Sequence, residues 1–125
     1  MKKTLAALTL ITASISNADI IKCIFTEPFV NSTYSTTQST LTYKDYENKT
    51  KVIKGVSFQI KSAGAFELVK DGKVLQTLTL SHKGSDGMSD MVYPYEVMDS
   101  GLDRMANGGH GGCSSNHLKA TEEQP

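Results

Sequence analysis

The sequence has no tryptophan, only two cysteines and three prolines, and no excess of either charge. Lys and Arg number 13, as do Asp and Glu, so the chain lacks the positive charge that neutralises nucleic-acid phosphates. A length of 125 residues with 38% hydrophobic residues excludes both a multidomain protein and a disordered tail. These values predict one small globular domain with no nucleic-acid partner.

Long apolar runs are also scarce, and the single one lies at the amino terminus. Lys2 and Lys3 precede the apolar residues 4–15. Residues 16–18 follow, with small side chains at Ser16 and Ala18. This pattern is typical of a secretory signal peptide, cleaved after Ala18 so that Asp19 becomes the first residue. The apolar part is shorter than the roughly 20 residues of a membrane-spanning helix. We therefore expect a signal peptide at residues 1–18, with a net charge of about −2 on the 11 basic and 13 acidic residues that remain.

The two cysteines predict a disulfide. In a lipoprotein a small residue precedes the lipidated cysteine, but Cys23 follows the bulky, charged Lys22. We therefore expect a soluble periplasmic or secreted bacterial protein that is not lipid-anchored. In such an oxidising compartment an even cysteine count favours a Cys23–Cys113 bridge. Closing a 90-residue loop constrains the unfolded chain by about 4 kcal/mol in the loop-entropy model.

Short segments with the two-residue period of β-strands follow the leader, and no amphipathic helix is evident. These segments are residues 20–25, 41–46, 51–61, 66–80 and 91–98. The polar stretch 31–40 suits an exposed hairpin or loop. Asp71-Gly72 is typical of a two-residue hairpin turn. Pro94 has no backbone N–H, so it must lie at an edge or a bulge.

Six to eight such strands predict an all-β fold. Barrel closure removes unprotected sheet edges, so we expect a small antiparallel β-barrel, lipocalin-like or similar, over residues 19–118. A two-sheet sandwich is the alternative, and the sequence does not separate the two. Four glycines in the five positions 108–112 predict a mobile loop anchored by Cys113, and residues 119–125 predict a flexible tail.

Three motifs carry a family resemblance. T-E-P-F at residues 26–29, D-G-M-S-D-x-x-Y-P at residues 86–94 and G-C at residues 112–113 resemble those of a family of small uncharacterised bacterial envelope proteins. Val30 stands where the family has tryptophan, and Ser85 where it has cysteine. Some members occur beside domains similar to bacterial lysozyme inhibitors, which are small exported β-barrels with a disulfide. The resemblance thus implies an exported module and a direction for its function, but no mechanism.

The same motifs supply the candidate binding residues, which are Glu27, Phe29, Asp86, Met88, Asp90 and Tyr93. Each also has a structural interpretation. The carboxylates in these segments can accept backbone N–H groups and close turns, and an aromatic side chain can fill the end of the barrel. The spacing of Asp86 and Asp90 lacks the further ligands of an EF-hand, so no metal site is predicted.

Catalytic motifs are missing from the sequence. It contains no G-x-S-x-G elbow and no phosphate-binding glycine loop between a strand and a helix. The histidines His82, His110 and His117 are scattered, unlike the ligands of a zinc site. We expect no enzymatic activity and no cofactor.

The expected function is that of a monomeric, non-enzymatic binding module of the cell envelope, whose ligand is an unknown protein or a small apolar molecule. The alternative is an inhibitor of a cell-wall hydrolase such as lysozyme, in which Glu27, Asp86 and Asp90 face a basic enzyme surface.

Overall fold

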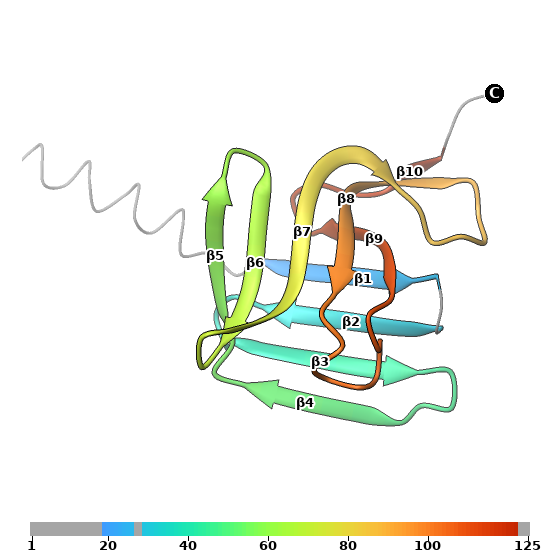
Figure 1. The fold of residues 1–125 in the computed structure, drawn as a ribbon. Helices are drawn as coiled ribbons and strands as arrows, with labels where there is room; N and C mark the ends of the chain where they lie inside the picture. Colours follow the sequence, from blue (N-terminus) through green and yellow to red (C-terminus); the bar gives the residue numbers. More distant parts are fainter. Residues whose placement is uncertain (1–18, 27–28, 123–125) are drawn as a thin grey trace, which may run out of the picture.

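The computed structural model describes residues 19–26 and 29–122, which form ten strands of antiparallel sheet (Figure 1). The strands are β1 (Ile20–Phe25), β2 (Val30–Ser35), β3 (Thr40–Asp45), β4 (Thr50–Lys54), β5 (Ser57–Ser62), β6 (Ala65–Lys70), β7 (Lys73–Gly84), β8 (Met91–Asp99), β9 (His110–Ser115) and β10 (Thr121–Glu122). Nine of them follow the order β4-β3-β2-β1-β9-β8-β7-β6-β5, and β10 pairs with β8. The all-β prediction is confirmed, whereas the expected signal peptide lies outside the described residues.

The sheet does not close into the expected barrel. Its two end strands, β4 and β5, are joined by Gly55 and Val56 but do not pair within the described residues. Gly55 has a positive φ of 75°, which ends the single strand predicted over residues 51–61. Val56 then turns inward and is fully buried, and its carbonyl accepts a hydrogen bond from the Tyr34 hydroxyl at 2.7 Å. An inward turn at this point separates the strands that barrel closure would have paired.

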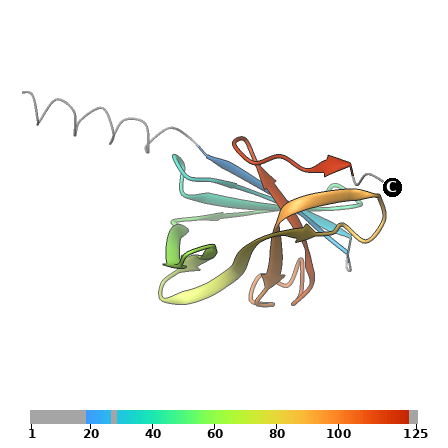
Figure 2. The ribbon, with the colours of Figure 1, turned by 90° about the horizontal axis from the view of Figure 1, so that it is seen from above.

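The open sheet folds over itself into two layers, which agrees with the sandwich alternative. In Figure 1, β1–β4 run across the view and β5–β8 run nearly perpendicular to them, and Figure 2 shows the two groups on opposite sides of the interior. Inward-facing side chains from both groups form the core. Its largest members include Phe25, Tyr34, Leu41, Tyr43, Leu68 and Leu78. Within the described ranges there is no helix that is long and apolar enough to cross a membrane.

Local turn chemistry follows the sequence closely. Asp71 and Gly72 both have positive φ, 52° and 77°, at the tip of the predicted β6–β7 hairpin. The polar stretch 31–40 forms the β2–β3 hairpin, although its inward-facing Ser32 and Tyr34 are buried. Pro94 lies at the β7–β8 register shift, between the pairs Leu80–Tyr95 and Gly84–Tyr93, so the predicted bulge is confirmed.

The glycine-rich segment differs from its prediction. Residues 110–115 are a central strand, β9, which pairs with β1 on one side and β8 on the other. A Cβ on Gly111 would lie 2.0 Å from the Ile24 carbonyl oxygen, and one on Gly112 would lie 2.8 Å from the Tyr93 ring. The glycines therefore allow close approach of neighbouring strands and do not form a mobile loop over these residues. In the segment predicted as a tail, Thr121 and Glu122 pair with Val92 and Met91 of β8.

Candidate functional site

The predicted Cys23–Cys113 disulfide is confirmed and joins β1 to β9. The two residues lie directly opposite each other in the β1–β9 register, and both are buried. The bond therefore joins the first strand along the chain, β1, to the ninth, β9. It leaves no free cysteine in the described residues, so no thiol there is a candidate nucleophile or metal ligand.

Residues 85–90, between β7 and β8, form a loop organised around Asp86. Asp86 Oδ1 accepts hydrogen bonds from the backbone N–H groups of Met88 and Ser89, both at 2.8 Å. Asp86 Oδ2 accepts bonds from the Ser89 hydroxyl at 2.7 Å and the Tyr93 hydroxyl at 2.8 Å. Two of the predicted binding residues, Asp86 and Tyr93, thus bind each other in the interior and hold the loop in shape.

These contacts also set the charge state of the loop. Hydrogen bonds from Ser89, the Met88 amide and Tyr93 outweigh the effect of burial and hold the pKa of Asp86 well below its ordinary value. Burial, followed by the hydrogen bond to Asp86, raises the pKa of Tyr93 to about 12. Asp86 is therefore an anion and Tyr93 a neutral donor at physiological pH. The pair has the properties of a structural clamp.

The loop presents Met88 to solvent close to Phe29. Phe29 is 52% exposed and Met88 is 65% exposed, and both line a depression of about 150 Å³. Tyr46, which follows β3 and is 79% exposed, lines the same depression. Phe29 precedes β2, Tyr46 follows β3 and Met88 lies between β7 and β8, so three separate segments bring large side chains to this depression. We call Phe29, Tyr46 and Met88 the apolar rim.

Tyr46 lies on a turn that is also closed by an aspartate side chain. Asp45 Oδ1 accepts the backbone N–H groups of Glu47 and Lys49, both at 2.9 Å. The turn falls in the gap between the predicted strands 41–46 and 51–61, but no sequence pattern identifies Tyr46 as a surface residue of interest. An aspartate that closes a turn next to an exposed apolar side chain is the signal shared with Asp86 and Met88.

Asp90 is not part of the rim. Asp90 lines a separate surface depression of about 310 Å³ together with His82, Lys83 and Met91. Glu27 lies outside the described residues. The structure therefore brings Phe29 and Met88 to one depression, uses Asp86 and Tyr93 to hold the loop that carries Met88, and places Asp90 at a separate depression.

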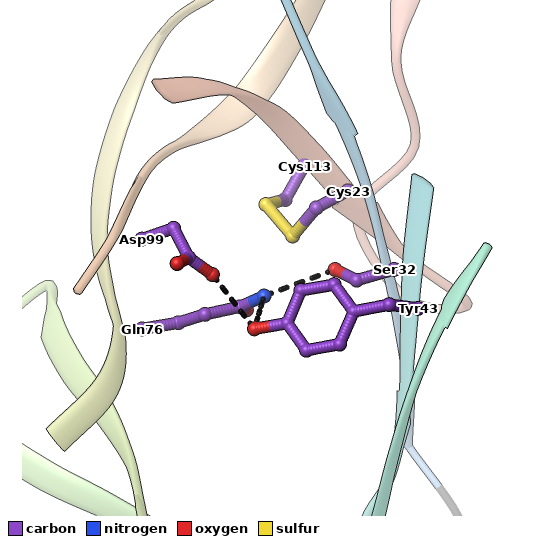
Figure 3. The surroundings of a disulfide bond; sticks show 6 residues. All are labelled: Cys23, Ser32, Tyr43, Gln76, Asp99 and Cys113. Carbon is purple, nitrogen blue, oxygen red and sulfur yellow. Dashed lines mark hydrogen bonds between the residues drawn. A yellow bond between two sulfur atoms is a disulfide. The ribbon is translucent and has the colours of Figure 1, made fainter. Parts of the chain in front are cut away.

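A buried polar network that sequence patterns do not reveal crosses between the layers near the disulfide (Figure 3). The Tyr43 hydroxyl donates to Asp99 Oδ2 at 2.7 Å. Gln76 Nε2 donates to the Tyr43 hydroxyl and to Ser32 Oγ, both at 3.1 Å. Because its members come from β2, β3, β7 and β8, the network fixes how the two layers face each other.

In the described residues, no group of three His, Cys, Asp or Glu side chains could hold a metal ion. His117 Nε2 lies 2.6 Å from Asp19 Oδ1 at the surface, where Asn116 Oδ1 also accepts the Ile20 N–H. These contacts hold the end of β9 to the start of β1.

No family model, no curated protein and no solved structure matches the chain.

Proposed function

We propose that the protein is an exported, non-enzymatic binding module of the bacterial cell envelope and that it contacts a partner protein through the apolar rim. The observation that carries the proposal is the convergence of Phe29, Tyr46 and Met88, all more than half exposed, around one depression. Aromatic residues and methionine are enriched in protein interfaces, and clusters of exposed apolar side chains commonly mark interaction sites.

The support beneath the rim favours binding. Asp86 and Asp45 hold the turns that carry Met88 and Tyr46, so little conformational entropy is lost when a partner covers them. The Cys23–Cys113 bond and the resemblance to envelope proteins fit an exported protein. The buried carboxyl group of the 85–90 loop, Asp86, is occupied by internal hydrogen bonds, which favours a structural role for this residue over a catalytic one.

Site-specific photo-crosslinking in a producing bacterium tests this function. A photoreactive phenylalanine analogue would replace Phe29, Tyr46 or Met88, and Ile60, which is 71% exposed on β5, would be the matched control position. We expect the same protein adduct from all three rim positions and none from Ile60. Adducts of equal yield from Ile60, or none from any rim position, would contradict the proposal.

The shape of the 85–90 loop favours the second candidate, a hydrolase inhibitor. Enzyme inhibitors commonly bind through preformed loops that change little on binding. Here Asp86 fixes the loop, Met88 projects from it, and Asp90 adds an exposed negative charge that suits a basic enzyme. Titration into lysozyme assays tests this candidate: wild-type protein should slow hydrolysis and Met88→Asp should not. Full lysozyme activity at tens of micromolar wild-type protein would remove the candidate.

A further inference from the structure

Two buried carboxyl groups lie next to each other where β8 ends. Asp99 is the last residue of β8, and Asp103 is in the connection to β9, which we call the 100–109 loop. Asp99 is 3% exposed and Asp103 is 2% exposed. Neither is part of the apolar rim, and the proposed function uses neither.

A count of hydrogen-bond donors leaves one carboxylate oxygen without a partner. Asp99 Oδ1 accepts from the Gly101 N–H at 2.8 Å, and its Oδ2 accepts from the Tyr43 hydroxyl at 2.7 Å. Asp103 Oδ1 accepts from the N–H groups of Met105 at 2.7 Å and Ala106 at 2.8 Å. Asp103 Oδ2 is buried and has no hydrogen-bond partner among the described residues.

A proton on Asp99 would provide a donor for Asp103 Oδ2 and would also remove one of two adjacent negative charges. Two adjacent buried carboxylates cannot both be ionised without a large electrostatic cost, and a protonated carboxyl group supplies one additional donor. A bound calcium ion fits less well, because it needs six to eight oxygen ligands and three of the four carboxylate oxygens already accept hydrogen bonds.

We propose that Asp99 and Asp103 share one proton, and that loss of this proton releases the 100–109 loop from the end of β8. Tyr43 ties Asp99 to β3, and the loop itself is held to β4 by Lys51, whose Nζ donates to the Asp103 carbonyl oxygen at 2.6 Å. Tyr43 and Lys51 are the titratable side chains from other elements that bind the pair, and Gln76 from β7 reaches it through Tyr43.

The electrostatics of the pair place the transition near neutral pH. Burial, followed by the neighbouring Asp103, raises the pKa of Asp99 to about 7. For Asp103, burial acts to raise the pKa, but hydrogen bonds from Asp99, Ala106 and Met105 outweigh it, and the pKa is lowered. The folded protein therefore keeps a proton that the unfolded chain has already lost above the ordinary aspartate value of 3.8. Stability conferred by this proton falls as pH rises from about 4 to 7.

Urea unfolding at pH 5, 6, 7 and 8 tests the shared proton. In the wild type the unfolding equilibrium constant should rise with pH, with a total change of about tenfold for each unit by which the pKa is raised. Asp99→Asn places a neutral N–H donor where the protonated carboxyl group would be, so its stability should change much less over this range. Asp86→Asn is the matched control: it alters a buried carboxylate of lowered pKa and should keep the wild-type slope. An unchanged slope in Asp99→Asn would overturn the proposal.

Three further measurements test the proposal, and the first two need only the wild type. Carboxyl ¹³C chemical shifts of the wild type should show one of the two aspartates titrating near neutral pH, and titration of both below pH 5 would overturn the proposal. Amide hydrogen exchange in the 100–109 loop should accelerate above neutral pH by more than base catalysis explains. A calcium-induced rise in the wild-type melting temperature at pH 8, lost in Asp99→Asn, would assign the pair to a cation and also overturn it.

Discussion

Cys23 and Cys113 lie directly opposite each other on β1 and β9, with their Cα atoms 4.0 Å apart. The β1–β9 pairing joins the run β4-β3-β2-β1 to the run β9-β8-β7-β6-β5 within the described sheet. The disulfide therefore spans the one strand pairing of the main path that connects its amino-terminal and carboxy-terminal runs.

Replacing both cysteines with alanine should lower the free energy of unfolding by about 4 kcal/mol, because the unfolded chain is then free of a 90-residue loop. Urea unfolding of the oxidised wild type and of the double variant measures the difference. Reduced wild-type protein is the control and should unfold close to the variant. Equal urea midpoints for the oxidised wild type and the variant would show that the bond does not stabilise the fold.

Gly112→Ala should destabilise the protein by about 1–3 kcal/mol, since the new methyl group would overlap the Tyr93 ring at 2.8 Å and the Ser85 nitrogen at 2.9 Å. Thermal unfolding measures the loss. Ser114→Ala, two residues along the same strand, is the matched control and should change the melting temperature little. If both variants had the melting temperature of the wild type, this result would contradict the close packing of Gly112 against Tyr93.

The contrast between two glycine segments shows what the sequence can predict. Asp71 and Gly72 form a hairpin turn because of their own backbone preferences, with positive φ at both residues, and this information is local. Gly111 and Gly112 are in a central strand because Ile24 and Tyr93 approach them from elsewhere in the chain. Glycine composition alone predicts flexibility, so the mobile loop was the wrong expectation there.

The same distinction divides the candidate site. The Asp86 turn could be predicted because the carboxylate binds residues two and three positions away. The hydrogen bond between Tyr43 and Asp99 joins residues 56 positions apart, and no local sequence pattern indicates it. Likewise, Phe29 and Met88 could be selected from motifs, but their shared depression with Tyr46 depends on the fold.

Asp86→Asn should remove an acid-dependent contribution to stability. The folded-state pKa of Asp86 lies below the ordinary value of 3.8, so its contribution is present above that value and is lost as pH falls through the folded-state pKa. The wild type should therefore lose stability below about pH 4, and the variant should show a smaller loss from a lower starting point. Urea midpoints between pH 2.5 and 5.5 measure both. Asp90→Asn, in the same loop and exposed, is the control and should retain the wild-type pH profile. Parallel acid profiles for Asp86→Asn and the wild type would contradict this role.

Tyr43→Phe should cost about 1–3 kcal/mol, because it leaves Asp99 Oδ2 without a buried partner and removes one of the two hydrogen bonds of Gln76 Nε2. The cost should be larger at pH 8 than at pH 5. The Tyr43 hydrogen bond acts to lower the pKa of Asp99, so its loss raises that pKa further and penalises the ionised form most. Urea unfolding at the two pH values measures the difference. Tyr46→Phe removes a hydroxyl from a side chain that is 79% exposed and should change stability little at either pH. A Tyr43→Phe cost that is independent of pH would mean that the hydroxyl supports packing of the two layers without influencing the charge of Asp99.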